Sequence, residues 1–111
     1  MNMAAPARVQ SDPVLVEIKR RLREFYGDRL EGVVLFGSRA RGDHKRTSDY
    51  DVAVYLTGYD YTMGEILALA DISWEIQAET KAIVSFKPFP SAIAVRDTRL
   101  SREIAKDGVP L

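Results

Sequence analysis

The chain lacks cysteine, and none of its apolar runs approaches the length of a membrane-spanning helix. No disulfide can form within its 111 residues, and a membrane span would need about 20 consecutive apolar residues. The first residues, MNMAAPARVQ, contain no apolar core of the kind that an export signal requires. Without an export signal or a disulfide, we expect the protein to work in the cytoplasm.

The chain also lacks an excess of either charge, since 16 Lys and Arg balance 16 Asp and Glu. Affinity for nucleic acids comes largely from neutralising phosphates with a cationic surface, so we do not expect general nucleic-acid binding. The charge is nevertheless uneven along the chain: Arg39, Arg41, Lys45 and Arg46 are accompanied by a single acid, Asp43. This cluster predicts a local anion site.

Length and composition are typical of one globular domain. Hydrophobic residues make up 46% of the chain and charged residues 29%, which are ordinary values for a soluble protein. A chain of 111 residues can bury a modest core. We therefore expect a single domain over residues 11–111, preceded by a flexible tail over residues 1–10.

Hydrophobic periodicity and turn residues predict alternating helices and strands. A first helix should begin at Ser11 or Asp12, either of which can cap it, and end at Gly27. Its apolar positions recur at helical spacing: Val14, Leu15, Ile18, Leu22 and Phe25. Strands are expected over residues 32–36, 50–56 and 81–86, a long helix over 62–79 and a short helix closed by Gly108. This order predicts an α/β (α+β) fold in which helices flank a small three-stranded mixed sheet.

The helix expected over residues 62–79 is apolar on two sides. Thr62 and Glu65 form a capping-box pattern at its start. One apolar stripe consists of Met63, Ile66, Leu67, Ala70 and Trp74, and another of Leu69, Ile72 and Ile76. A helix that covers a sheet needs only one stripe. The second stripe therefore predicts a further packing surface, for a homo-oligomer or another partner.

The stretch GSRARGDHKRTSDYD, residues 37–51, connects the first two expected strands. Asp49 and Asp51 are two residues apart, so on a strand their carboxylates lie on one face, about 7 Å apart. Two such carboxylates can share divalent cations such as Mg²⁺, which take oxygen ligands and usually keep a substrate phosphate among them. The end of this stretch therefore predicts a metal site.

The start of the same stretch is suited to phosphate. Gly37 has no Cβ, so its backbone can approach a phosphate closely, and Ser38 adds a hydroxyl. If a helix starts at Ser38, its free N–H groups would attract an anion, and Arg39 and Arg41 would add charge-assisted hydrogen bonds. Together with a metal site at the same rim, this pattern is suited to in-line attack on the α-phosphorus of a nucleotide.

A polar connection between strands is the simpler interpretation of residues 37–51. Gly, Ser and Asp are common turn formers, and this reading accounts for the segment GDHKRTSD. It does not explain why Gly-Ser ends one apolar strand while two aspartates open the next. We therefore favour a nucleotide site over a polar connection.

This stretch resembles the signature of the minimal nucleotidyltransferases of the DNA-polymerase-β-like superfamily, which is Gly-Ser, ten residues, then Asp-x-Asp. Ten residues separate Ser38 from Asp49, and the flanks LFGSRARG and SDYDVAVYL are also similar. The resemblance implies a polymerase-β-like fold, ATP or another nucleoside triphosphate as substrate, and two Mg²⁺ ions held by Asp49 and Asp51 as catalytic residues. It implies nucleotide-binding roles for Gly37, Ser38, Arg39, Arg41 and Ser48.

The resemblance is incomplete at the third strand. Members of the superfamily usually carry a third carboxylate there, which helps to activate the attacking hydroxyl, but the segment KAIVSFKPF contains no acid. Ile83 or Ser85 stands at the expected position. Glu79 is the nearest substitute and is our third candidate catalytic residue, although a surface residue at a helix end is the simpler interpretation.

The resemblance also implies a protein partner. Only about 25 residues follow the third expected strand, too few for an acceptor-binding domain. Small proteins of this family are commonly antitoxins paired with a HEPN-type toxin, and some transfer AMP from ATP to a toxin tyrosine. We therefore expect a protein adenylyltransferase. The absent carboxylate motivates an alternative, an inactive antitoxin that neutralises by binding. Transfer to a small molecule such as an aminoglycoside is a third hypothesis.

Overall fold

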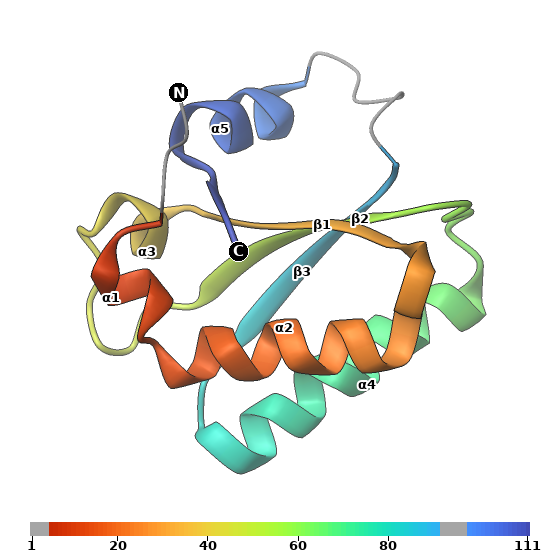
Figure 1. The fold of residues 1–111 in the computed structure, drawn as a ribbon, viewed down its shortest axis with the longest axis horizontal. Coiled ribbons are helices and arrows are strands. Elements are labelled where there is room, and N and C mark those ends of the chain that lie inside the picture. The colour runs from red at the N-terminus through yellow and green to blue at the C-terminus, as the bar shows by residue number, and fades with distance from the viewer. Residues whose placement is uncertain (1–4, 92–97) are drawn as a thin grey trace.

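The computed structural model describes residues 5–91 and 98–111, which form one mixed sheet with helices on both faces (Figure 1). The helices are α1 (Ala7–Gln10), α2 (Pro13–Tyr26), α3 (Ser38–Arg41), α4 (Met63–Thr80) and α5 (Arg99–Asp107), with a 3-10 turn at Gly27–Arg29. The strands are β1 (Leu30–Phe36), β2 (Tyr50–Leu56), β3 (Val84–Pro90) and β4 (Val109–Pro110). The α/β fold expected from the sequence is therefore confirmed.

The sheet has four strands in the order β3-β2-β1-β4, not the three that we expected. β2 pairs in parallel with β3, whereas β1 is antiparallel to both β2 and β4. Two residues of β4 pair with Val34 and Leu35 of β1. A two-residue strand that includes Pro110 has no alternation of polar and apolar residues, so sequence periodicity could not reveal it.

β3 lies later in the chain than the expected 81–86. Lys81 has φ +67 and ends α4 by donating its backbone N–H to the Gln77 carbonyl, so it belongs to the helix end. The strand instead runs from Val84 through Pro88 to Pro90. Proline is tolerated there because β3 is an edge strand, where a backbone donor is not needed on the outer side.

The helices pack against the two faces of the sheet unequally. α2 and α4 cover one face, and α5 lies over the other (Figure 1). The main core under α2 and α4 is apolar and includes Ile18, Leu22, Leu35, Val52, Val54, Leu56 and Ile76, none of which is exposed. Within the described residues, no helix is both long and apolar enough to cross a membrane.

The structure shows which residue caps α2 and which residue of its last turn is buried. Of the two candidate caps, Asp12 is the N-cap, and its side chain accepts a hydrogen bond from the Val14 N–H. At the other end, Phe25, which we listed with the apolar positions at helical spacing, is largely exposed, and Tyr26 is buried in its place. Tyr26 lies four residues after the fully buried Leu22 and continues that face.

Residues 7–10, which we expected to belong to a flexible N-terminal tail, form α1. Val9 joins the main core. The Arg8 guanidinium donates hydrogen bonds to the backbone carbonyls of Arg39 and Ala40, at 2.7 and 2.8 Å. This segment is therefore held to the region that follows β1. Residues 1–4 lie outside the described chain.

Candidate active site

The Gly-Ser end of β1 and the acidic start of β2 meet at one rim of the sheet. Phe36, the last residue of β1, pairs with Asp51 of β2. Gly37 follows with φ +74, and a Cβ at this position would lie 2.5 Å from the Oδ2 atom of Asp51. A side chain at Gly37 would therefore both strain the backbone and displace the carboxylate. The glycine lets the backbone pass directly beside the acidic pair.

Asp51 lies on the face of the sheet that α5 covers, together with Ala53. Tyr50, between the two aspartates, is buried in the core on the opposite face, as the alternation of a strand predicts. Within the described chain, neither Asp49 nor Asp51 makes a side-chain hydrogen bond or ion pair. Their carboxylate oxygens are therefore available to an added ligand.

Electrostatics at the rim favour a cation. Burial raises the pKa of Asp51, and the neighbouring carboxylates of Asp49 and Glu103 raise it further. The positive charges of Lys87 and Arg41 act in the opposite direction. Asp51 is partly buried and Asp49 is exposed. The two neighbouring carboxylates have no direct partners and repel each other, and a bound divalent cation would relieve this repulsion.

These residues fit Mg²⁺ only as a partial ligand set. No group of three or more His, Cys, Asp or Glu side chains is gathered for a metal anywhere in residues 5–91 and 98–111. Mg²⁺ commonly binds through one or two carboxylates and completes its shell with waters and substrate phosphates. The pair Asp49 and Asp51 would hold the ion in this way, with a nucleotide supplying further oxygens.

Ser38 begins α3, which is a single turn after Gly37. The backbone N–H groups of Ala40 and Arg41 both donate to the Gly37 carbonyl at 3.1 Å. The N–H groups of Ser38 and Arg39 and the Ser38 hydroxyl have no acceptor in the described chain. These donors lie next to the acidic rim and are the groups best suited to contact a phosphate there.

Arg39, which we expected to bind the triphosphate, is directed into its own loop. Its guanidinium carbon lies 3.9 Å from the centre of the Tyr50 ring. Its Nε donates to the Ser48 carbonyl at 2.9 Å, and its Nη2 to the Arg46 carbonyl at 3.0 Å. The side chain is thus already used in holding the segment that leads to Asp49.

Arg41 and Ser48 also have partners within the protein. The Arg41 guanidinium contacts Asp43 at 3.1 Å and Asp107 of α5 at 3.3 Å, and these carboxylates raise its pKa. The Ser48 hydroxyl accepts a hydrogen bond from the Lys45 N–H at 2.9 Å. Arg41 would have to exchange its carboxylates for phosphate, whereas the Ser48 hydroxyl shapes a turn.

The third strand brings a hydroxyl and a cation, not a carboxylate, toward the rim. In the parallel register, Ser85 pairs with Asp51 and Lys87 pairs with Ala53. Residues paired across strands share a face, so Ser85 occupies the place beside Asp51 at which the third acid was sought. Of our two candidates for that place, Ser85 rather than Ile83 is the one beside Asp51.

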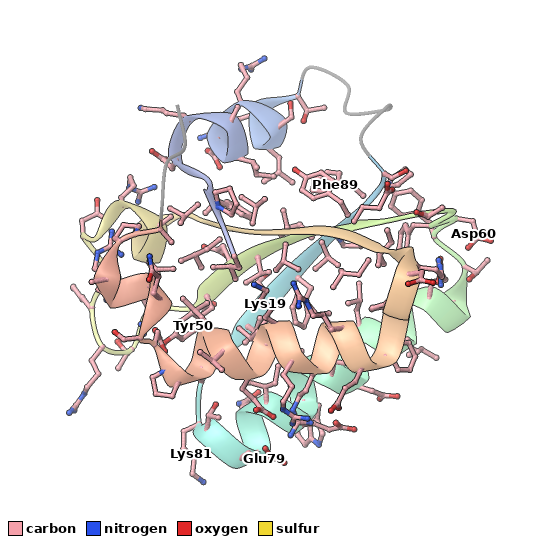
Figure 2. The ribbon with its side chains drawn as sticks, viewed as in Figure 1. Lys19, Tyr50, Asp60, Glu79, Lys81 and Phe89 are labelled. Atoms are coloured by element: carbon pink, nitrogen blue, oxygen red, sulfur yellow. The ribbon has the colours of Figure 1, made fainter. Side chains whose placement is uncertain are left out.

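Glu79 does not join this cluster. It lies near the end of α4, on the opposite side of the sheet from α5 (Figure 2). Its carboxylate is paired with Arg21 of α2. The structure therefore does not bring Glu79 to the acidic pair, and the simpler interpretation, a surface residue, describes it.

The contribution of α5 to the site could not be seen in the sequence. Glu103 of this helix is near enough to Asp51 to raise its pKa, and Asp107 pairs with Arg41. Both acids follow the segment 92–97, which lies outside the described residues. No motif marked them, because they are distant in sequence from residues 37–51 and are brought close only by the packing of α5 on the sheet.

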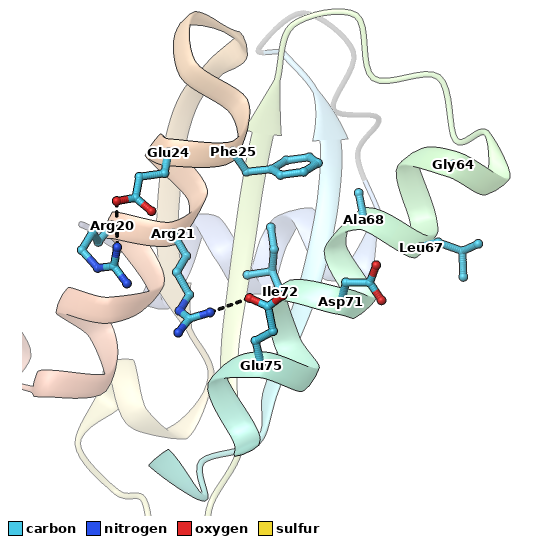
Figure 3. Close-up of a pocket in the computed structure, with 10 residues that line it drawn as sticks. All are labelled: Arg20, Arg21, Glu24, Phe25, Gly64, Leu67, Ala68, Asp71, Ile72 and Glu75. Atoms are coloured by element: carbon cyan, nitrogen blue, oxygen red, sulfur yellow. Dashed lines mark hydrogen bonds and ion pairs between the residues drawn. The ribbon is translucent and has the colours of Figure 1, made fainter. Parts of the chain in front are cut away.

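Two grooves of the molecule lie away from this rim. One, of about 570 Å³, runs between α2 and α4, where Arg21 pairs with Glu75 and Phe25 and Leu67 lie along the edges (Figure 3). The other, of about 410 Å³, lies between α4 and β3 and is largely apolar. Neither is lined by a predicted site residue. The acidic rim is an open site, outside both grooves.

Comparison with known families identifies the class of protein. Residues 15–109 match the family model described as a nucleotidyltransferase domain. This match covers most of the chain, and the chain belongs to this nucleotidyltransferase family. The membership agrees with the Gly-Ser and Asp-x-Asp arrangement at the rim.

One relative is similar to this chain over a short stretch. A Methanocaldococcus jannaschii protein provisionally named a protein adenylyltransferase, MJ0141, is 42% identical over 41 residues, which are 37% of this chain and 41% of that protein. The matched stretch thus spans less than half of that relative.

Solved structures share the fold at low sequence identity. A chain from a toxin–antitoxin structure with AMP-PNP has a TM-score of 0.62 at 22% identity, covering 84% of this chain and 68% of that one. A chain from the tri-AMPylated Shewanella oneidensis HEPN toxin in complex with its MNT antitoxin has a TM-score of 0.55 at 15% identity, covering 87% and 70%. These similarities establish the nucleotidyltransferase fold of this chain.

Proposed function

We propose that this chain is a Mg²⁺-dependent protein adenylyltransferase that transfers AMP from ATP to a tyrosine of a HEPN-type toxin and thereby acts as its antitoxin. The observation that carries the proposal is the close approach of Gly37 to Asp51, which puts free backbone donors beside an unpartnered acidic pair. The similarity to chains from toxin–antitoxin structures, one with AMP-PNP and one with an AMPylated toxin, supports the choice of nucleotide and partner.

The proposed transfer uses the two halves of the rim for different tasks. The Ser38 hydroxyl and the free N–H groups of Ser38 and Arg39 would bind phosphate oxygens of ATP. Asp49 and Asp51 would hold Mg²⁺, which would supply positive charge to offset the negative charge of the phosphates. The tyrosine oxygen forms a bond to the α-phosphorus, the bond to the bridging oxygen breaks, pyrophosphate leaves, and the tyrosine proton passes to water.

One observation favours a second candidate, an antitoxin that neutralises by binding alone. Ser85 is the β3 residue paired with Asp51, so no carboxylate of that strand is available there as a general base. A positioned base typically contributes about 10² to 10⁴ in rate. Without this contribution, chemistry at the rim would be slow, and occlusion of the partner would account for neutralisation.

Co-expression with a candidate HEPN-type toxin separates the two candidates. The double substitution Asp49→Ala/Asp51→Ala should abolish both neutralisation and transfer of label from α-labelled ATP, while γ-labelled ATP should label nothing. Full neutralisation by a soluble, folded double variant would favour binding alone. Labelling from γ-labelled ATP would instead indicate phosphorylation and contradict the proposal.

A further inference from the structure

We propose that Arg39 is a positioning residue for the metal end of the site and not a ligand of the triphosphate. Its position, next to Ser38 in a basic segment, suggested phosphate binding, but its contacts are with the protein. The proposal rests on the role in metal binding proposed above for Asp49 and Asp51. It assigns to Arg39 the task of holding Asp49 beside Asp51.

The Arg39 guanidinium group is hydrogen-bonded to the loop at two backbone positions. Its Nε and Nη2 atoms donate to the carbonyls of Ser48 and Arg46, at 2.9 and 3.0 Å. Ser48 directly precedes Asp49, so the first of these hydrogen bonds fixes the peptide from which Asp49 projects. Asp49 itself lies just before β2 and outside its ladder, so it depends on the loop for its position.

The other contact of the guanidinium joins the loop to the core. Its carbon lies 3.9 Å from the centre of the Tyr50 ring, at the distance of a cation–π contact. Tyr50 is buried, and its hydroxyl donates to the Oδ2 atom of Asp12, the N-cap of α2, at 2.8 Å. Arg39 is thus stacked on a side chain that is fixed by both the sheet and a helix end.

The backbone of Arg39 is fixed as well. Its carbonyl accepts a hydrogen bond from the Arg8 guanidinium at 2.7 Å, and the Ala40 carbonyl accepts another at 2.8 Å. One residue therefore connects α3, where phosphate is expected, with the segment that carries Asp49. A guanidinium released from these contacts to bind phosphate would leave two carbonyls of the loop without their donors.

This set of contacts requires the shape of arginine and not only its charge. A planar guanidinium can stack on an aromatic ring while it donates to two carbonyls in its plane, whereas a lysine ammonium cannot do both. Arg39→Lys should therefore weaken metal binding by Asp49 and Asp51 almost as much as Arg39→Ala does. A role as a phosphate ligand predicts instead that the charge of lysine restores most of the function.

Binding of Mn²⁺, measured by electron paramagnetic resonance with AMP-PNP present, tests the proposal. We expect Arg39→Lys and Arg39→Ala each to raise the dissociation constant for Mn²⁺ by about tenfold, the loss usual for residues that orient metal ligands. The matched control is Arg23→Lys, because the Arg23 side chain of α2 is exposed, lies away from the rim and has no partner among the described residues. It should bind Mn²⁺ within about twofold of the wild type.

The same titration separates failure of this inference from failure of the proposed function. If Asp49→Asn binds Mn²⁺ as tightly as the wild type, the metal site itself is wrong. If Asp49→Asn loses Mn²⁺ while Arg39→Lys keeps it, only the role of Arg39 is overturned. Loss of AMP-PNP affinity in Arg39→Ala, with Mn²⁺ affinity retained, would also overturn it and identify a phosphate ligand.

A measurement on the wild-type chain guards against variants that do not fold. In a nuclear magnetic resonance spectrum, the Arg39 Nε–H should be protected from exchange before nucleotide is added, because it donates to Ser48. Its signal should move little when AMP-PNP and Mg²⁺ bind. A rapidly exchanging Nε–H, or a large shift on nucleotide binding, would contradict the positioning role.

Discussion

At the residue scale, two glycines with positive φ allow the effect of backbone strain to be measured apart from the effect of a side chain in the site. Gly37 has φ +74 and Gly58 has φ +69, so alanine at either position is strained, by about 1–3 kcal/mol. Only at Gly37 would the added Cβ meet another residue, the Asp51 carboxylate, whereas nothing lies within 4 Å at Gly58. Comparing alanine at these two positions therefore distinguishes a loss of stability from a loss of metal binding.

We expect Gly37→Ala to lose Mn²⁺ binding and AMP transfer, because the new methyl group must displace Asp51. Gly58→Ala should lose stability in denaturant unfolding but keep its Mn²⁺ affinity. Equal Mn²⁺ affinities in the two folded variants would show that the close approach at Gly37 has no bearing on the metal site.

The residue scale also shows which features of the rim could be predicted from sequence. Gly37, Asp49 and Asp51 could be proposed as site residues from their spacing along the chain, and the register of β1 on β2 brings Gly37 to Asp51. Their roles in binding and catalysis stay predictions. The direction of Arg39 could not be found in this way. It depends on a ring and two carbonyls whose positions are set only when the loop folds back.

At the scale of elements, α1 acts as a cap on α3. Arg8 supplies donors to the carbonyls of Arg39 and Ala40, which a four-residue helix cannot satisfy internally. Arg8→Ala should therefore destabilise the protein by about 1–2 kcal/mol. It should also speed amide hydrogen exchange over residues 38–42 more than elsewhere.

Hydrogen exchange followed by mass spectrometry checks this prediction. Arg23→Ala is the control, since Arg23 is an exposed arginine of α2 with no side-chain partner within the described ranges. If exchange over residues 38–42 is unchanged in Arg8→Ala, α1 does not support α3, and its packing serves the core through Val9 alone.

An ion pair joins the start of α4 to Arg29, in the 3-10 turn that follows α2. Glu65 accepts from Arg29 through both carboxylate oxygens, at 2.7 and 2.9 Å, and from the Asp60 N–H at 3.3 Å. These contacts lower the pKa of Glu65, with the Arg29 hydrogen bonds as the main cause. Because the pKa of Glu65 is lowered by folding, the ion pair stabilises the fold at pH values above the unfolded-state pKa of about 4.3.

Glu65→Gln should therefore be less stable than the wild type at pH 7, by less than about 1 kcal/mol for a partly exposed pair. The difference should disappear as the pH falls through the lowered pKa of Glu65, where the wild-type carboxylate is protonated as well. Urea unfolding at several pH values measures it. A difference that persists at low pH would mean that packing, and not charge, accounts for the effect.

Elements with regular patterns were predicted from sequence, and irregular ones were not. β2 and the long helix α4 have the expected bounds within a residue, because alternation and a capping threonine mark them. In that cap, the Glu65 N–H donates to Thr62, but the Glu65 carboxylate turns to Arg29 and Asp60. β3 and β4 contain prolines and owe their pairing to neighbouring strands, so their bounds depend on the assembled sheet.

At the scale of the whole molecule, α4 leaves an apolar surface uncovered. Met63, Ile66, Leu67 and Trp74 are 68%, 46%, 53% and 72% exposed. They form the stripe that the sequence predicted in addition to the buried one. Contiguous exposed apolar surface commonly marks an interaction site. Self-association through α4 remains a prediction, and the toxin partner proposed above is the other candidate for this surface.

We expect the wild-type chain to associate as its concentration rises in sedimentation velocity, and Trp74→Glu to remain monomeric. Val16→Glu is the control, since Val16 of α2 is similarly exposed, at 57%, but lies outside the α4 stripe. Because Trp74 is the only tryptophan, its emission should shift to shorter wavelengths on association. A wild type that stays monomeric with unshifted emission would contradict self-association through α4.

Transfer of AMP to a protein by the acidic rim is tested most directly by the intact mass of the proposed toxin partner. After incubation with ATP, Mg²⁺ and the wild-type chain, the toxin should gain the mass of one or more AMP groups, located on tyrosine by fragmentation. With Asp49→Asn in place of the wild type, it should gain none. A toxin that stays unmodified with the wild-type chain, or is modified equally by Asp49→Asn, would contradict adenylyl transfer at this site.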